Sequence, residues 1–256
     1  VEMKNYKNFK FINFFSKSKF VLININRKLY LKKKIRNPQK RDFESILKNN
    51  FFYKNIKIDN VKAQHIDIES LKDLKKKNYF ITEYINGSSG DLILSNLGSN
   101  EINAISNFIR EYFNYIQKRI HWVRFNRKII TNKLDEIYIK IKIPYLKKLF
   151  NKNKKNVLNE IDNINYYPNS FCHGDLTLSN MIIAKNKIYL IDFLKTYNDG
   201  IAQDLSKIYQ EFILGWSSRK FKDKEFLRSE TIYRKVIKNN FFYLFPKNIR
   251  KVLKFE

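Results

Sequence analysis

The spacing of the apolar residues changes near residue 86, and this change most constrains the fold. Before it, short β-branched and aromatic runs alternate with polar turns, as in antiparallel strands. After it, apolar residues recur at three- and four-residue intervals, as on one buried helix face. The first such face comprises Ile102, Ile105, Phe108, Ile109, Tyr112 and Ile116. The sequence therefore predicts an α+β chain with a small sheet-rich part at residues 1–85 and a larger helical part at residues 86–256.

The first part is expected to hold an antiparallel meander and one helix. The expected strands are Phe9–Phe15, Phe20–Ile25, Lys28–Ile35, Val61–Ile68 and Tyr79–Ile85. Asn37 can cap a helix that has Pro38 at its first position and runs to about Lys48, with acidic residues near its positive end.

In the second part, a further helix is expected over Lys133–Lys148, with Pro144 as a break. The basic stretch 147–156 is interpreted as a solvated loop, and another helix precedes Tyr166. A hairpin of two short strands, Met181–Ala184 and Ile188–Ile191, follows, and the chain is helical from Gln203 onward.

Charge and cysteine content limit the function classes. The net charge is +27, but the lysines are spread from Lys4 to Lys254 rather than gathered in one stripe, so we do not expect a nucleic-acid-binding protein. A single cysteine, Cys172, excludes an internal disulfide and favours the cytoplasm. No run approaches about 18 apolar residues, and the first apolar runs are too broken for a secretory leader, so neither a membrane span nor a leader is expected.

The segment from Phe171 to Phe193 (FCHGDLTLSNMIIAKNKIYLIDF) places polar side chains in an apolar run. Phosphoryl transfer from ATP needs bridging metal ions, oxygen ligands for them and a group near the incoming hydroxyl. Asp175 and Asn180, five residues apart, can share these tasks: the carboxylate faces the hydroxyl and the amide oxygen faces magnesium. Asp192, after the next hairpin, adds an anionic oxygen to the same metal site.

These residues resemble the catalytic loop H-G-D-x-x-x-x-N of the aminoglycoside phosphotransferase/choline kinase family, from His173 to Asn180 and on to Ile191-Asp192-Phe193. The resemblance implies a bilobal protein-kinase-like fold and phosphorylation of small-molecule hydroxyls with ATP and Mg²⁺. It implies that Asp175 is the catalytic base, that Asn180 and Asp192 bind magnesium, and that His173 supports the loop. Gly200 to Leu205 resembles the family's G-x-P-x-x-D-L-A segment without its proline, which gives Asp204 a bracing role.

The first part resembles the nucleotide-binding lobe of kinases. Backbone groups of Glu83 to Ile85 are expected to contact adenine, unless this segment is only a strand that leads into a turn. Leu29-Tyr30-Leu31-Lys32 resembles the V-A-I-K strand. Lys32 is therefore the expected phosphate-contacting lysine, with Lys34 on the same strand face as the alternative.

Glu44, early in the following helix, is the expected partner of that lysine, with Asp42 as the competitor. No glycine precedes Gly87, so a glycine-rich phosphate loop is missing. Ser16 and Ser18 lie where that loop would be, and their hydroxyls and amides are predicted to contact phosphate, unless the segment is a plain solvated turn.

The prediction is an ATP- and Mg²⁺-dependent phosphotransferase that acts on a sugar, sugar phosphate, amino acid or amino alcohol. Similar catalytic loops occur in kinase-like proteins associated with bacterial surface-polysaccharide synthesis, which is therefore one predicted pathway. Acidic residues number 24 against 51 lysines and arginines, which favours a neutral or anionic acceptor. Trp216 and Tyr209 could cage a quaternary ammonium, although core packing is the competing role. Leu194 stands where protein kinases have the glycine of D-F-G, which argues against a protein kinase. The alternatives are an inactive kinase-like binding module and a basic protein that binds nucleic acid or a membrane surface.

Overall fold

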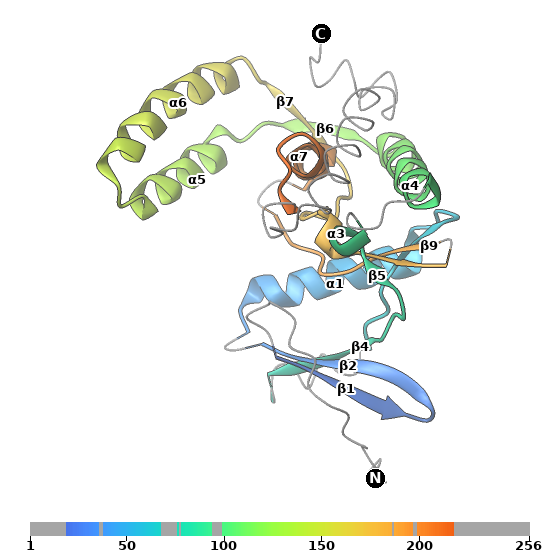
Figure 1. Ribbon diagram of the computed structural model, residues 1–256. Coiled ribbons are helices and arrows are strands. Elements are labelled where there is room, and N and C mark those ends of the chain that lie inside the picture. Colours follow the sequence, from blue (N-terminus) through green and yellow to red (C-terminus); the bar gives the residue numbers. More distant parts are fainter. Residues whose placement is uncertain are drawn as a thin grey trace.

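A computed structural model describes residues 19–35, 38–67, 76, 78–93, 99–185, 187–196 and 199–217 (Figure 1). The strand expected at Phe9–Phe15, the serines Ser16 and Ser18, and the helical continuation past residue 217 lie outside this described part. Within it, an antiparallel sheet forms the N-terminal region and helices dominate the C-terminal region, which confirms the predicted α+β class.

The N-terminal sheet has the strand order β1-β2-β4, all antiparallel. β1 (Lys19–Ile25) and β2 (Lys28–Lys34) form a hairpin, and β4 (Tyr79–Glu83) pairs with the other edge of β2. The turn residues Asn26 and Arg27 have φ angles of 51° and 64°. Two consecutive positive φ angles are typical of the tight turn whose twist matches that of a β-hairpin, and asparagine tolerates this conformation well.

Helix α1 (Lys40–Asn55) follows the hairpin and extends beyond the predicted end near Lys48. Its N-cap is Gln39, which exchanges hydrogen bonds with Asp42 in a capping box, while the expected cap Asn37 lies outside the described residues. The helix continues because Phe52 still belongs to its buried face and reaches the main core.

A second sheet joins the two regions of the chain. Its order is β3-β9-β8-β5. β8 (Met181–Ala184) and β9 (Lys187–Leu190) form the predicted hairpin, and β5 (Ser88–Ser89) pairs with β8. β3 (Val61–Ala63), which comes before the change in periodicity, pairs with β9 in parallel.

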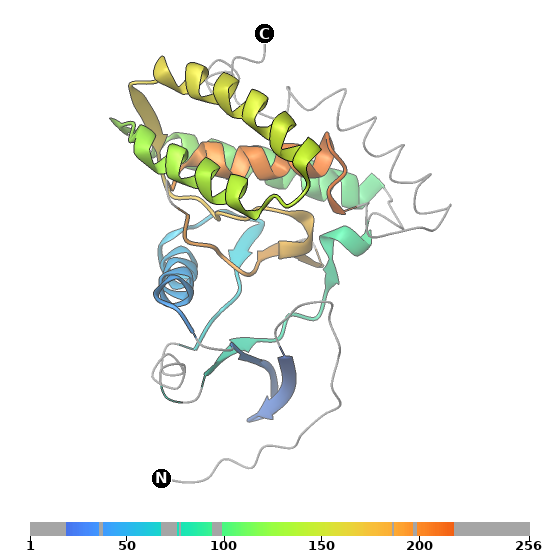
Figure 2. The same cartoon turned by 90° about the vertical axis from the view of Figure 1, so that its left-hand side faces the viewer.

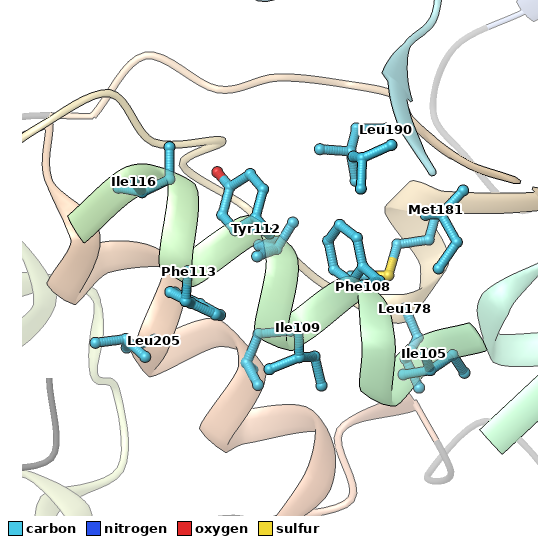
Figure 3. Close-up of a cluster of buried hydrophobic side chains, with 14 of the residues drawn as sticks. Ile105, Phe108, Ile109, Tyr112, Phe113, Ile116, Leu178, Met181, Leu190 and Leu205 are labelled. Atoms are coloured by element: carbon cyan, nitrogen blue, oxygen red, sulfur yellow. The ribbon is translucent and has the colours of Figure 1, made fainter. Parts of the chain in front are cut away.

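The main core lies between this sheet and two helices. α4 (Ser99–Gln117) and α7 (Ile201–Phe212) pack together, and short helices α3 (Gly90–Ile93) and η1 (Leu178–Asn180) lie nearby. Figure 3 shows the α4 side chains between those of the β8–β9 hairpin on one side and Leu205 of α7 on the other. The predicted apolar face of α4 is therefore the centre of the fold, with Ile105, Phe108, Ile109, Tyr112 and Ile116 all buried.

A helical hairpin stands apart from this core (Figures 1 and 2). It consists of α5 (Arg127–Lys140) and α6 (Pro144–Asp162), and the two-stranded ribbon of β6 (His121–Arg124) and β7 (Tyr166–Asn169) connects it to the rest. Pro144 occupies the start of α6, where its missing N–H costs nothing. The loop predicted at residues 147–156 is wrong, because this lysine-rich stretch lies within α6. None of the described helices is both apolar enough and long enough to cross a bilayer.

Candidate active site

A cleft of about 290 Å³ lies where α1 and the N-terminal sheet face the loop before β8 and the segment after β9. Asp175, Asn180 and Asp192 line it from one side. Lys33, Thr82 and Asn49 are among the residues that line it from the other. The three oxygen-bearing residues expected from the sequence to act together are therefore on one wall of one cleft.

Asp204 braces the loop that carries Asp175. Its carboxylate is buried and accepts hydrogen bonds from the backbone N–H groups of His173 at 2.7 Å and Gly174 at 2.8 Å, and from the Tyr112 hydroxyl at 2.6 Å. Burial raises the pKa of Asp204, and the neighbouring His173 and these donors oppose that rise. Burial and the adjacent carboxylate raise the pKa of Tyr112, so its hydroxyl remains a donor. The contacts agree with the bracing role predicted for Asp204.

His173 is fully buried and holds the loop through both ring nitrogens. Nδ1 accepts the backbone N–H of Asp175 at 3.2 Å, so the proton resides on Nε2, which donates to the carbonyl of Ile191 at 2.8 Å. Desolvation lowers the pKa of His173, which keeps this tautomer neutral. The imidazole thus joins the catalytic loop to the strand end before Asp192, and it touches the Phe193 ring at a centroid distance of 4.3 Å.

Gly174 stands where protein kinases have arginine, and the geometry requires it. Its φ is +93°, and a Cβ at this position would lie 2.1 Å from the carbonyl oxygen of Leu194. Any side chain here would push the loop away from the segment after Asp192.

Asn180 and Lys207 fix the Asp175 carboxylate. The Asn180 amide nitrogen donates to the Asp175 backbone carbonyl at 2.8 Å and to Oδ2 at 3.1 Å, so its Oδ1 is the atom left to face a cation. Lys207 Nζ lies 3.0 Å from Asp175 Oδ1. Lys207 was not predicted from the sequence. It follows Asp204 by about one helical turn, and this spacing could have placed it on the side of α7 that faces the loop.

Asp192 faces the opposite wall of the cleft. It has a φ of 54°, and its Oδ1 lies 2.5 Å from Lys33 Nζ. Aspartate adopts this left-handed backbone conformation more readily than most other non-glycine residues.

The cleft lysine is Lys33, whereas Lys32 was predicted and Lys34 was the alternative. Strand side chains alternate, so Lys32 and Lys34 point away from the cleft. Lys32 Nζ lies over the Tyr79 ring at 3.9 Å, and Lys34 is exposed. Lys33 lies between the rings of Phe20 at 5.2 Å and Phe80 at 6.0 Å.

The predicted helical partner, Glu44, also lies off the cleft, because two residues along a helix turn a side chain by more than half a revolution from Asp42. Glu44 contacts Lys40 at 3.7 Å. Asp42 does line the cleft, but its Oδ2 accepts the Gln39 backbone N–H at 2.7 Å. Asn49, missed from the sequence, lines the cleft from the Asp42 face; it is 2% exposed, and its Oδ1 finds no hydrogen-bond partner among the described residues.

The predicted adenine-contacting segment follows β4. The Glu83 backbone N–H donates to the His65 carbonyl at 2.9 Å, and the Glu83 carbonyl accepts from Gln64 Nε2 at 2.7 Å. Ile85 is buried. Neither Glu83 nor Ile85 lines the described cleft. Both backbone groups of Glu83 are therefore already bonded within the N-terminal region.

A polar cluster ties α1 to the segment after Asp192. Lys48 Nζ donates to the Leu194 carbonyl at 3.0 Å and to Asp199 Oδ1 at 2.9 Å, and it touches Cys172 Sγ at 3.3 Å. Burial alone would raise the pKa of Asp199, but hydrogen bonds from Lys195, Lys48 and Thr196 outweigh it and lower the pKa. Burial raises the pKa of the Cys172 thiol to about 12.

The donor set of the cleft fits magnesium. Mg²⁺ prefers carboxylate and amide oxygens and usually completes its shell with water and substrate phosphates rather than with an all-protein cage. Asp192 and the Oδ1 of Asn180 supply such oxygens. In the described part of the chain, no three His, Cys, Asp or Glu side chains converge as a metal site.

No family model matches the chain, and no curated protein matches it. Solved structures do. A thermostable mutant of aminoglycoside phosphotransferase APH(4)-Ia, in a ternary complex with ADP and hygromycin B, matches with a TM-score of 0.60 at 11% identity over 92% of this chain and 89% of that one. The choline kinase LicA of Streptococcus pneumoniae gives 0.54 at 16% identity over 89% and 75%. The ethanolamine kinase of Plasmodium vivax gives 0.50 at 18% identity over 88% and 67%.

At identities this low, the structural matches establish the fold alone, and any statement about chemistry must come from the residues in the cleft. The matches extend over most of this chain, so both regions contribute to the likeness. The chain has the protein-kinase-like fold shared by aminoglycoside phosphotransferases, choline kinase and ethanolamine kinase.

Proposed function

We propose that this chain is a phosphotransferase that moves the γ-phosphoryl group of ATP to a hydroxyl group of a small molecule. One observation carries the proposal: Asp175, Asn180, Asp192 and Lys33 line the same cleft, from two facing walls. These are the residue types that phosphoryl transfer uses to position a hydroxyl, a divalent cation and phosphate oxygens. The neighbours of known structure named above are kinases of small molecules.

The roles follow from the contacts. Asp175 orients the acceptor hydroxyl and takes its proton as the new oxygen–phosphorus bond forms and the bond to the bridging oxygen of ADP breaks. Asn180 holds the carboxylate of Asp175 through its amide nitrogen and offers its oxygen to the cation. When bound, Mg²⁺ supplies positive charge to the phosphate oxygens. His173 and Asp204 position the loop without touching the reacting atoms.

Lys33 is our proposed phosphate-contacting lysine in place of Lys32. Its present ion pair with Asp192 joins two groups that both serve the phosphates, so each can hold the other in place before the nucleotide arrives. Ile85 remains the proposed adenine contact, and Ser16 and Ser18 remain expected phosphate contacts outside the described residues.

Lys207 supports a neutral or anionic acceptor, such as a sugar or a sugar phosphate. Its ammonium group lies 3.0 Å from the carboxylate that would receive the hydroxyl proton, so an acceptor cation close to that hydroxyl would be repelled. Tyr209 packs against the main core, and Trp216 is 48% exposed and lies off the described cleft, which gives little support to an ammonium cage. Surface-polysaccharide synthesis and a cytoplasmic location, consistent with one buried free thiol, stay as predictions.

The test measures magnesium-dependent release of ADP against a panel of acceptors: choline, ethanolamine, amino acids, hexoses, heptoses, their phosphates and an aminoglycoside. Asp175→Asn serves as the blank, and we expect it to lose turnover by at least about a hundredfold while it still binds ATP. Lys33→Met should lose most activity, whereas its matched control Lys32→Met, which removes the neighbouring charge from the other strand face, should keep it.

Equal losses in the two lysine variants would contradict the assignment of Lys33. If the protein binds ATP but transfers phosphate to no compound in the panel, its acceptor is a compound that the panel does not contain. Absence of both ATP binding and turnover would favour an inactive kinase-like module, and salt-sensitive binding to DNA or RNA in its place would favour a basic binding protein.

A further inference from the structure

The helical hairpin of α5 and α6 leaves most of its surface uncovered. α5 contains no buried residue, and in α6 only Ile161, near its end, is buried. The two helices hold each other through the Lys154–Asp135 ion pair and the tilted contact between the rings of Tyr138 and Phe150. Figure 1 shows the hairpin extending away from the sheets, with the turn between its helices at the far end.

The far end of the hairpin, residues 137–149, has an unusual composition. We call this segment the tip. Of its thirteen residues, nine are aliphatic, aromatic or proline and the other four are lysines: Lys140, Lys142, Lys147 and Lys148. It contains no acidic residue. Ile139 is 76% exposed and Tyr145 is 71% exposed, so the apolar side chains are not sheltered by the hairpin itself.

We propose that the tip docks on the surface of an anionic phospholipid bilayer. Exposed isoleucine, leucine and tyrosine side chains next to lysines suit the boundary between headgroups and acyl chains, where apolar groups enter and ammonium groups stay with the phosphates. Positive charge near an anionic leaflet adds to the affinity of each inserted apolar group. The hairpin lies on the membrane in this arrangement and does not span it.

The composition favours a bilayer over other occupants. Single-stranded nucleic acid is usually held by aromatic rings that stack on bases, but the tip is mainly aliphatic. A tip-to-tip contact between two copies would bring lysines against lysines with no carboxylate between them. Against an anionic bilayer, both the lysines and the aliphatic side chains find favourable surroundings.

The first experiment measures sedimentation of the full chain with vesicles of phosphatidylcholine alone or mixed with phosphatidylglycerol. We expect binding to the mixed vesicles only, weakened by salt. Changing Lys140, Lys142, Lys147 and Lys148 to Gln should lower the partition coefficient by about a hundredfold or more, since each lysine near the surface contributes about fivefold. Changing Ile139, Ile143 and Leu146 to Ser should lower it by about tenfold or more at unchanged charge.

The matched control removes the same charge elsewhere. Lys28, Lys54, Lys57 and Lys62 are exposed and belong to β2, α1, the segment after α1 and β3, in that order. Their change to Gln should leave vesicle binding within about twofold of the parent. An Ile143→Trp variant reports insertion directly, because its fluorescence should shift to the blue on anionic vesicles relative to the parent protein.

Three outcomes would overturn the proposal. Equal loss of binding in the tip and control variants would assign binding to net charge. No binding to anionic vesicles would exclude a bilayer. If sedimentation velocity shows that the parent protein is a dimer, that the tip variant is a monomer and that neither binds vesicles, the tip is an interface between copies. None of these readouts requires turnover, so the result is independent of the proposed phosphotransferase activity.

Discussion

Replacing Asp204 by Asn tests the bracing of the catalytic loop with almost no change in shape. The carboxylate serves buried donors with both oxygens: Tyr112 and His173 bond to Oδ2, and Gly174 bonds to Oδ1. An asparagine has one oxygen. In its best orientation, that oxygen keeps the first two donors and its NH₂ group then faces the Gly174 N–H.

The expected cost follows from these contacts. The unpaired and buried Gly174 N–H costs about 1–3 kcal/mol. The other two hydrogen bonds lose their ionic acceptor and weaken by about 1 kcal/mol each. Burying a neutral amide in place of a carboxylate returns part of this loss. The free energy of unfolding should therefore fall by about 2–4 kcal/mol.

Urea unfolding of the full chain, followed by circular dichroism, measures this change. Tyr112→Phe is the matched control, because it removes one donor from the same carboxylate and leaves no acceptor unpaired; it should cost only about 1 kcal/mol. An Asp204→Asn cost within about 0.5 kcal/mol of zero, or a smaller cost than that of Tyr112→Phe, would refute the reasoning.

Other predictions follow from single residues. Gly174→Ala should lower the free energy of unfolding by more than about 3 kcal/mol in the same assay, because a Cβ would meet the Leu194 carbonyl at 2.1 Å; a fully stable variant would contradict the loop geometry. Burial lowers the pKa of His173, so the unfolded chain binds a proton that the folded chain does not, and stability should decline as the pH falls below about 6.5. His173→Gln should reduce that pH dependence, and an unchanged slope would show that other groups cause it. Burial raises the pKa of Cys172 to about 12, so native protein near neutral pH should resist a thiol reagent that reacts at once after unfolding.

The grouping of Asp175, Asn180 and Asp192 in one cleft could be predicted because these residues are close in the sequence. Asp175 and Asn180 share one loop, and a short hairpin carries the chain back to Asp192. Local geometry alone brings these residues together. Lys207 and Asn49 were missed because they approach the loop only through the packing of α7 and α1, which no local pattern specifies.

The choice among three consecutive lysines shows that side-chain alternation, rather than the match to V-A-I-K, identifies the lysine that enters the cleft. Leu31 and Ile35 share a strand face with Lys33, whereas Lys32 shares its face with Tyr30 and Lys34. The apolar face of a strand turns toward the interior, so its lysine is the one that enters the cleft. The match to V-A-I-K selects Lys32, the first lysine of the run, because it takes no account of which strand face each side chain occupies.

The loop predicted for the basic run in α6 was wrong for a different reason. A lysine-rich stretch such as residues 147–156 satisfies the pattern of a solvated loop, but Lys and Leu are good helix formers and Pro144 starts the helix cleanly. The apolar residues of α6, such as Leu146, Phe150 and Ile161, recur at helical spacing, but the polar run at residues 151–156 interrupts that pattern. The existence of this helix depends on the partner helix α5 and on the ribbon below it.

The parallel pairing of β3 with β9 has consequences for how the molecule can move and be divided. Together with the Lys48–Asp199 pair, it binds β3 and α1 to the helical region. Backbone hydrogen bonds join β4 to the segment after β3, so any movement of the β1-β2-β4 sheet as a nucleotide enters would have to bend the chain at these bonds. A fragment cut at residue 86 would expose the edge of β3 and separate Lys48 from its carboxylate. We therefore expect the two halves to be recovered as a soluble, folded pair when they are expressed together, and neither to fold when it is expressed alone.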